Sequence, residues 1–413
     1  MEEKLRFIVE YERDEQTMTD LCEAFGIARE TGYVWLRRYR AAGVGGLVEL
    51  NRAAQRHPNQ TAGEIEQAVL ELRQAHMRWG PRKLKRVLER DQPGRSWPAA
   101  STIGALLQRE GLVVGRKSRR KTEPYSQPLA HADGCNRVWC CDFKGWFRTG
   151  DGERIDPLTI SDAYSRYLLR CQAVEKTNTE RVRAIFEAAF REYGMPQAIR
   201  SDNGAPFAST ALAGLSRLAV WWLKLGIVAE RIAAGHPEQN GRHERMHRTL
   251  KQEVASPPAK DRRRQQHELD RFRQEYNQVR PHEALGMQTP ASVYQVSSRE
   301  YPARVPEPEY PDSMLVRSVK SHGGFRWQKH DVFLSEVLWG ERIGLLPRDE
   351  RWYTVYFAHV PLAQFDSWKR RVLPLPPGAG FDMEEAGEGE VSPSPAPHPL
   401  EPGTEKVSGM CPV

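Results

Sequence analysis

Cysteine is scarce in this sequence, and long apolar runs are missing. The 413 residues include only six cysteines, too few for a disulfide-stapled scaffold: Cys22, Cys135, Cys140, Cys141, Cys171 and Cys411. No run of about 18 apolar residues occurs, so no membrane span is expected. The first residues, MEEKLRFIVEYERDE, are too charged for a signal peptide. These absences predict a soluble protein of a reducing compartment.

Apolar residues make up 39% of the chain, enough for several small cores but low for one large core. The net charge of +7 is uneven, because residues 373–413 hold seven acids and one base and therefore carry −6. Residues 1–372 then carry +13. A basic body favours a polyanionic partner, since binding a polyanion releases its condensed counterions. A basic protein without such a partner would have the same charge.

Residues 1–55 have the pattern of short helices with a sharp break. Within TMTDLCEAFGIARETGYVWLRRYR, Thr17 or Thr19 can cap one helix, and Gly26 allows a tight turn before the next. The second helix ends in three basic residues, Arg37, Arg38 and Arg40. This pattern predicts a helix-turn-helix unit whose arginines contact DNA phosphates. An ordinary helical hairpin is the alternative.

Residues 61–114 predict a second helix-turn-helix unit. Pro81 stands at a helix start in WGPRKLKRVLE, where Arg82 and Lys83 are candidate DNA contacts. A turn leads to WPAASTIGALLQREGLV, in which Ser101 or Thr102 can begin a further helix. Residues 115–133, basic and with two prolines, are predicted to be a linker.

Residues 134–256 begin with three strand patterns, at Arg137–Phe143, Ile155–Ser161 and Tyr167–Val174. Alternating elements follow: a helix at about Thr179–Tyr193, a strand at Ala198–Ser201, a helix at Leu212–Leu225, a strand at Ile227–Arg231 and a helix that runs to about Val254. This order predicts a mixed sheet with helices on its faces. Residues 257–300 are predicted to be a helical segment. Residues 312–372 are predicted to be a small β-barrel of short strands, one of which is WYTVYFAHV. Residues 373–413 have the composition of a disordered acidic tail.

Three acids stand at the ends of predicted elements in the alternating region: Asp142 in WCCDF, Asp202 in SDNGAPF and Glu244 in NGRHER. Carboxylates at strand ends and on a facing helix can converge at one sheet edge, where they would repel one another unless cations intervene. Oxygen-rich sites of this kind suit Mg²⁺ or Mn²⁺, and two ions would support in-line phosphoryl transfer. A single acid in isolation is usually a solvated surface group, and Glu230 and Glu238 compete with Glu244.

Five motifs in order make the pattern more specific: WCCDF, TISDAYSRY, RSDNGAPF, HPEQNGRHER and YNQVRPHEALG. Over about residues 15–295 they resemble the DDE transposase and retroviral-integrase-like superfamily, most closely bacterial insertion-sequence transposases. The resemblance implies an RNase H-like core in which Asp142, Asp202 and Glu244 are catalytic and bind metal. It favours Glu244 over Glu238 because the family glutamate follows the Asn-Gly pair by three residues. It also implies that Asp162 is not a ligand.

One departure is the 41 residues that separate Asp202 from Glu244, more than in many family members. The helix that carries Glu244 also places His247, Arg248 and Lys251 on the face of the acid, where cations would hold a phosphodiester. A solvated basic face is the alternative. His131, Cys135 and Cys140–Cys141 lack an obvious zinc ligand set, and no chemistry is predicted for YNQVRPHEALG.

The resemblance predicts a multidomain DNA transposase that exposes 3′ ends of a mobile element and transfers them into target DNA. Its helix-turn-helix units would recognise the terminal repeats of double-stranded DNA, and handling two ends together predicts a homo-oligomer. The expected location is the bacterial cytoplasm, in association with the nucleoid. The alternatives are a domesticated DNA-binding regulator without catalysis and an RNase H-fold nuclease that cuts without joining.

Overall fold

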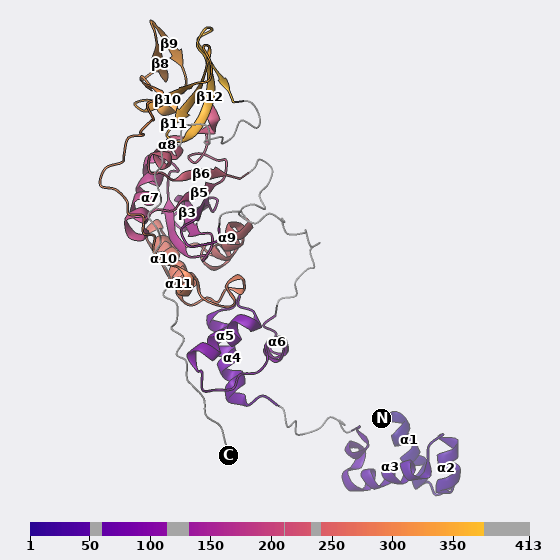
Figure 1. The fold of residues 1–413 in the computed structure, drawn as a ribbon. Helices are drawn as coiled ribbons and strands as arrows, with labels where there is room; N and C mark the ends of the chain where they lie inside the picture. Colours follow the sequence, from indigo (N-terminus) through magenta and orange to yellow (C-terminus); the bar gives the residue numbers. More distant parts are fainter. Residues whose placement is uncertain (50–59, 114–131, 210, 233–240, 376–413) are drawn as a thin grey trace, which may run out of the picture. The chain divides into compact units, whose positions relative to one another are not determined.

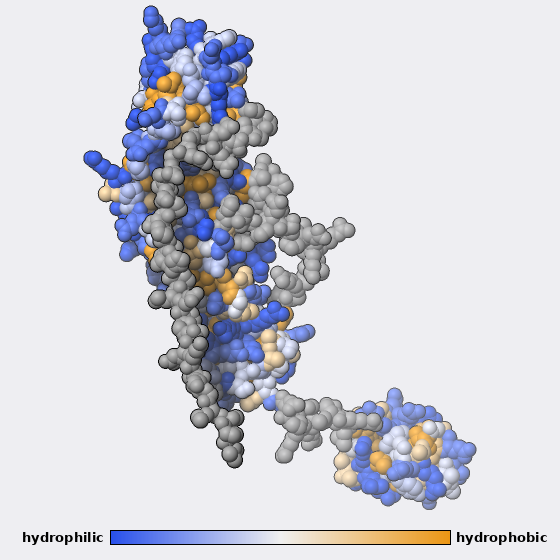
Figure 2. Space-filling view, viewed as in Figure 1, coloured by the Kyte–Doolittle hydropathy of each residue, from blue (hydrophilic) through white to orange (hydrophobic). Residues whose placement is uncertain are grey.

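The computed structural model describes residues 1–49, 60–113, 132–209, 211–232 and 241–375. The chain divides into two compact units, Met1–Ala68 and Val69–Val413, which are described separately (Figure 1). Most of the predicted linker at 115–133 and of the predicted tail at 373–413 lies outside the described residues. Within those residues, no helix is long and apolar enough to cross a membrane. On the face drawn in Figure 2, hydrophilic residues predominate, and apolar residues form smaller scattered patches.

The first unit is a helix-turn-helix fold. Its elements are α1 (Glu2–Glu12), α2 (Met18–Ala24), α3 (Arg29–Ala42) and η1 (Gly43–Leu47). Thr17, not Thr19, caps α2 by accepting a hydrogen bond from the Asp20 backbone. Gly26 then turns the chain with φ +62°. A β-carbon at Gly32 would come within 2.6 Å of the Cys22 sulfur, so glycine lets α3 pack closely on α2.

Three further helices precede the sheet, and the first spans the boundary between the units: α4 (Gly63–Ala75), α5 (Pro81–Asp91) and α6 (Ala100–Arg109). Pro81 begins α5, as the sequence predicts. α5 and α6 bury Leu84, Ile103 and Leu107. Arg73 of α4 donates hydrogen bonds to the carbonyls of Trp79 and Leu112. Leu112 follows α6, so these bonds join the first and last of the three helices.

The central sheet has the RNase H-like arrangement that the motifs predict. Its strands are β1 (Val138–Phe143), β2 (Phe147–Arg148), β3 (Arg154–Asp162), β4 (Leu168–Val174), β5 (Ala198–Ser201) and β6 (Val228–Arg231). β3 pairs antiparallel with β1 and β4, whereas β5 lies parallel between β1 and β6. The helices around it are α7 (Thr179–Tyr193), α8 (Arg217–Lys224), α9 (Gly241–Glu253) and α10 (Arg262–Gln278). The main core gathers side chains from the sheet, α7 and α8.

The helix predicted at Leu212–Leu225 is shorter in the structure. Residues Leu212–Gly214 form a separate 3₁₀ turn, η2, in which Ala213 has φ +52°. Ser216 then caps α8 by accepting a hydrogen bond from the Ala219 backbone. The prediction of one continuous helix was wrong because the apolar pattern runs through a break that side-chain capping creates.

Helix α10 covers the edge of the sheet at β4. Asn277 is buried, and its amide accepts from the Leu168 N–H at 2.8 Å and donates to the Leu168 carbonyl at 2.9 Å. Gln266 repeats this pairing further along β4, with the Ala173 N–H at 2.8 Å and the Cys171 carbonyl at 3.1 Å. Side-chain amides therefore form the hydrogen bonds to backbone groups of β4 that an edge strand would otherwise lack. This is the structural role of Asn277 in YNQVRPHEALG. The same motif contains η4 (Glu283–Leu285), and α11 (Pro290–Val293) follows it.

The carboxy-terminal strands do not close into the predicted barrel. They are β7 (Leu315–Ser318), β8 (Gly324–Trp327), β9 (His330–Phe333), β10 (Arg342–Pro347), β11 (Trp352–Phe357), β12 (Val360–Asp366) and β13 (Arg371–Pro374), with the 3₁₀ turn η5 (Glu336–Leu338) before β10. Within the described residues, five of them form an open sheet in the order β13-β12-β11-β10-β7, and β8 and β9 form a separate hairpin. WYTVYFAHV, predicted as one strand, ends at Phe357 because Ala358 turns the chain with φ +49°.

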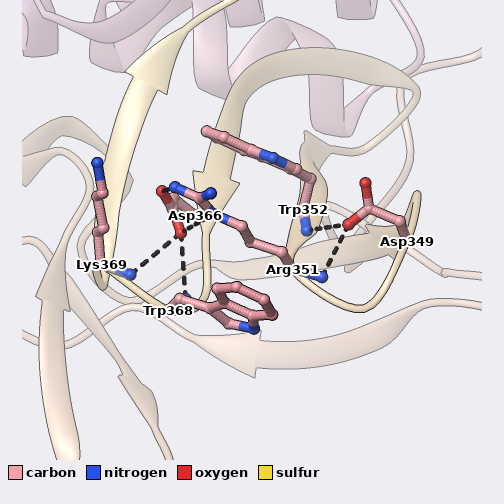
Figure 3. Close-up of polar contacts among 6 residues, drawn as sticks. All are labelled: Asp349, Arg351, Trp352, Asp366, Trp368 and Lys369. Atoms are coloured by element: carbon pink, nitrogen blue, oxygen red, sulfur yellow. Dashed lines mark hydrogen bonds and ion pairs between the residues drawn. The ribbon is translucent and has the colours of Figure 1, made fainter.

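A charged cluster joins the ends of β11 and β12. Arg351 donates hydrogen bonds to both carboxylate oxygens of Asp366 and lies between the rings of Trp352 and Trp368, at 5.0 and 5.4 Å from their centroids (Figure 3). The backbone N–H groups of Trp368 and Lys369 also donate to Asp366. Because Arg351 and these N–H groups stabilise its charged form, the pKa of the Asp366 carboxyl lies below its usual range.

Candidate active site

Two of the three predicted acids lie side by side at one edge of the sheet. In the parallel pair of β1 and β5, Val138 is opposite Ala198 and Cys140 is opposite Arg200. The same offset places Asp142 opposite Asp202, just past the last paired residues. Neighbouring strands run about 4.8 Å apart, so the two carboxylates share one patch of the edge. The strand register, which joins positions 60 residues apart, brings these acids together.

The charge of Asp202 acts on Asp142. The pKa of Asp142 is raised to about 7, first by burial and next by the charge of Asp202, with smaller contributions from Asp156 and Glu244. Among the residues that the structure describes, none hydrogen-bonds to the buried carboxylate oxygen Oδ1 of Asp202. A β-carbon at Gly204 would lie 2.9 Å from the other oxygen, so glycine leaves room beside this carboxylate. A divalent cation bound at this edge would stabilise the charged form of Asp142 and would coordinate the buried oxygen of Asp202.

The third predicted acid, Glu244, lies in the first turn of α9 and is exposed. Its charge contributes to the raised pKa of Asp142, so it lies within electrostatic reach of that carboxyl. Over the described part of the chain, no group of three or more His, Cys, Asp or Glu side chains is arranged to hold a metal ion. The structure thus joins Asp142 and Asp202 and leaves Glu244 on the facing helix. Glu230, one of the two competitors, pairs with Arg200 on β5, while Glu238 lies outside the described residues.

His247 does not form part of an exposed cationic face, contrary to the prediction from helix periodicity. Its side chain is buried against β3, and burial lowers its pKa to about 2. The imidazole is therefore neutral, and its 3.8 Å approach to the Asp142 carboxylate is not an ion pair. His243, one turn earlier, is also buried, with its pKa lowered to about 3. Arg248 and Lys251 remain exposed on α9.

Lys144 is a site residue that the sequence analysis missed. Its backbone N–H bonds to the Pro157 carbonyl, which continues the β1–β3 ladder and places Lys144 on the same face as Asp142. Burial lowers its pKa, and the charge of Lys251 lowers it further. Two cations therefore stand near the acidic edge. Lys144 lies two residues after Asp142, and side chains two apart on a strand point to the same face, so the sequence contained a signal for its position.

The other predicted contacts differ in their exposure. Arg37, Arg38 and Arg40 are exposed on α3, and Arg82 is exposed on α5. Lys83 is partly buried, and its pKa is lowered to about 8 by burial and by the charge of Arg280. The exposed positions of the four arginines are compatible with phosphate contacts, and the predicted DNA contact of the partly buried Lys83 stays a prediction.

Asp162 is fully buried and accepts hydrogen bonds from the backbone N–H groups of Asn136 and Ser165 and from the Ser165 hydroxyl. The Ser165 contacts hold the turn between β3 and β4, and the Asn136 contact joins this turn to the residues before β1. The structure therefore gives Asp162 a role in the fold and leaves its oxygens engaged by protein donors, consistent with its exclusion from the proposed ligands.

Comparison with protein families finds integrase core domains and helix-turn-helix domains in this chain. Two integrase core domain families match residues 132–237 and 225–290, and the second match includes Glu244. A helix-turn-helix domain family matches residues 3–54, and a homeodomain-like family matches residues 31–107.

Two curated relatives are encoded by insertion elements. The 39.2 kDa protein of insertion element IS476 from Xanthomonas euvesicatoria is 28% identical over 251 residues, which are 59% of this chain and 69% of that protein. The 31.7 kDa protein of insertion element IS407 from Burkholderia multivorans is 26% identical over 59% of this chain and 87% of its own length. Among solved structures, the magnesium complex of the HTLV-2 integrase catalytic core is 14% identical with a TM-score of 0.30, covering 41% of this chain and all of that one.

Proposed function

We propose that this chain, which carries an integrase core domain together with helix-turn-helix domains and is homologous to proteins encoded by bacterial insertion elements, is a DNA transposase. The observation that carries the proposal is the matched register of Asp142 and Asp202 on adjacent parallel strands of the core. The reaction is cleavage at the 3′ ends of the element and joining of those ends to target DNA. Both steps are phosphoryl transfers, so one site serves both.

Asp142, Asp202 and Glu244 are the proposed catalytic and metal-binding residues. Their oxygens suit Mg²⁺ or Mn²⁺, and two bound ions would supply activation of the attacking oxygen and stabilisation of the leaving oxygen. Asp142, whose pKa is raised to about 7, would bind such an ion in its deprotonated form. Glu244 is exposed, and an exposed glutamate can change its rotamer when an ion and DNA bind.

The basic residues supply the contacts to the substrate backbone. Lys144 and Lys251 stand near the acidic edge, and Arg248 is exposed on the helix of Glu244, so the three cations would hold the phosphodiester near the metal ligands. Residues 1–55 and 61–114 are the proposed recognition units for the element's terminal repeats, with the exposed arginines Arg37, Arg38, Arg40 and Arg82 on their helices. Because two DNA ends are joined in one event, the active form is a homo-oligomer, acting on the nucleoid of a bacterial cell.

The test is a strand-transfer assay with labelled DNA that contains the terminal repeats of the element, in the presence of Mg²⁺ or Mn²⁺. The variant Asp202→Asn should lose both cleavage and joining while it keeps DNA binding, because the amide cannot replace the carboxylate on a divalent ion. Asp312→Asn, which changes an exposed aspartate outside the core domain, is the matched control. Normal activity of Asp202→Asn would overturn the catalytic assignment.

The products separate the alternatives. Cut DNA without joined strands would identify a nuclease, and specific DNA binding without any metal-dependent cutting would identify a regulator. Joined strands that depend on Asp202 identify a transposase.

A further inference from the structure

A buried polar cluster connects the strand of Asp142 to the helix of Glu244. The Thr159 hydroxyl on β3 lies 2.6 Å from His243 Nε2, 2.7 Å from His247 Nε2 and 3.1 Å from the Asp142 carbonyl. The Ser161 hydroxyl lies 3.1 Å from His243 Nδ1. One side chain of β3 is thus within hydrogen-bonding distance of both β1 and α9.

The donors and acceptors of this cluster form a consistent set. Thr159 donates its single proton to the Asp142 carbonyl, so both histidines donate their Nε2–H groups to the Thr159 oxygen. His243 Nδ1 then accepts from the Ser161 hydroxyl. His247 Nδ1 lies 3.8 Å from Asp142 Oδ2 and makes no hydrogen bond to it at that distance.

We propose that Thr159 is a positioning residue that sets the spacing between Asp142 and Glu244 through His243 and His247. This inference rests on the proposed function, because it concerns the same pair of acids. Glu244 directly follows His243 and precedes His247 by three residues, so both anchors of α9 flank the acid. Fixing the two imidazoles on Thr159 fixes the first turns of the helix against β1.

The rest of α9 is held in a different way. Met246 and Leu250 of α9, and Val254 just after it, pack into an apolar cluster with Leu269 and Phe272 of α10. Apolar contacts depend weakly on direction and tolerate a small sliding of the helix, whereas hydrogen bonds of 2.6–2.7 Å do not. The polar contacts occur at the end of α9 that carries the acid, where displacement would move a metal ligand.

Two pairs of variants test the proposal. Thr159→Val keeps the shape and removes the hydroxyl, while Thr159→Ser keeps the hydroxyl. His247→Leu removes the donor, while His247→Gln retains an N–H near the position of Nε2. Thr354→Val is the control, because Thr354 is a buried threonine of β11 that accepts a hydrogen bond from Arg348 far from this cluster.

The main readout is the concentration of Mn²⁺ that gives half-maximal strand transfer, and the second is the rise in melting temperature that Mn²⁺ causes without DNA. Thr159→Val and His247→Leu should raise the required Mn²⁺ concentration about 10- to 100-fold, the range typical of residues that orient metal ligands. Thr159→Ser and His247→Gln should restore most of the wild-type value. A merely structural role would lower the melting temperature and leave the metal requirement unchanged.

An unchanged metal requirement in both Thr159→Val and His247→Leu would overturn the inference. If Thr159→Val does not fold, the comparison of His247→Leu with His247→Gln decides. An active wild-type chain with unaffected variants refutes the positioning role alone. A wild-type chain that neither cuts nor joins DNA with any metal refutes the proposed function instead.

Discussion

Replacing Asn277 by alanine should open the edge of the central sheet. The change removes one acceptor and one donor from the Leu168 backbone, and both groups are buried. An unsatisfied buried group costs about 1–3 kcal/mol, so the loss should be about 2–4 kcal/mol after relaxation. Gln278→Ala, on the adjacent exposed residue of α10, is the control and should cost less than about 0.5 kcal/mol.

Amide hydrogen exchange of the intact chain measures the loss of stability at β4, because peptides from that strand report on its own opening. A loss of about 2–4 kcal/mol corresponds to exchange roughly 30- to 700-fold faster at Leu168. Residues of β5, which lies in the interior of the sheet, should change less. If Asn277→Ala and Gln278→Ala exchange at the same rate along β4, the amide pairing contributes nothing and the reasoning is wrong.

Three further outcomes are expected. Gly204→Ala should lower strand transfer about a hundredfold with little loss of stability, because its new methyl group displaces the Asp202 carboxylate; an active variant in the same assay would contradict this. Arg37→Ala should reduce the slope of log binding constant against log salt concentration by about 0.9 if the arginine contacts one phosphate, whereas Arg13→Ala, at the residue that follows α1, should leave the slope unchanged. Asp366 has a lowered pKa in the folded sheet, so its contribution to stability is present above pH about 4 and is lost as the pH falls further. Asp366→Asn should therefore show a smaller fall in melting temperature between pH 5 and about pH 3 than the wild type, and equal falls would remove Asp366 as the cause.

Much of the fold follows from local patterns. Strand β5 and helix α7 have the predicted bounds, because flanking turns and capping residues such as Asn178 mark their ends in the sequence. The helix before β6 was predicted too long, since its apolar pattern continues through the break at Ala213. The barrel was predicted from the spacing of short strands, which reveals the strands but not whether the first and last of them pair.

Some residues of the candidate active site could be predicted from the sequence, and others could not. Asp142 and Asp202 could be selected from the sequence because each stands at the end of a predicted strand within a motif. The burial of His247 could not be predicted. Helix periodicity places His247 on the same face as Glu244, but it does not reveal that Thr159 of β3 lies against it. Lys144 was within reach of the alternation rule for strands, whereas its proximity to Lys251 required the packing of α9.

The order of motifs along the chain determined the class of the core domain, the helix-turn-helix units and the candidate acids, because these depend on residues close together in sequence. The tertiary structure alone decided the register that aligns Asp142 with Asp202, the burial that keeps His243 and His247 neutral, and the pairing of Asn277 with β4. Each of these depends on contacts between segments tens of residues apart. Burial, charge state and hydrogen-bond partners are properties of such contacts, which a local pattern does not contain.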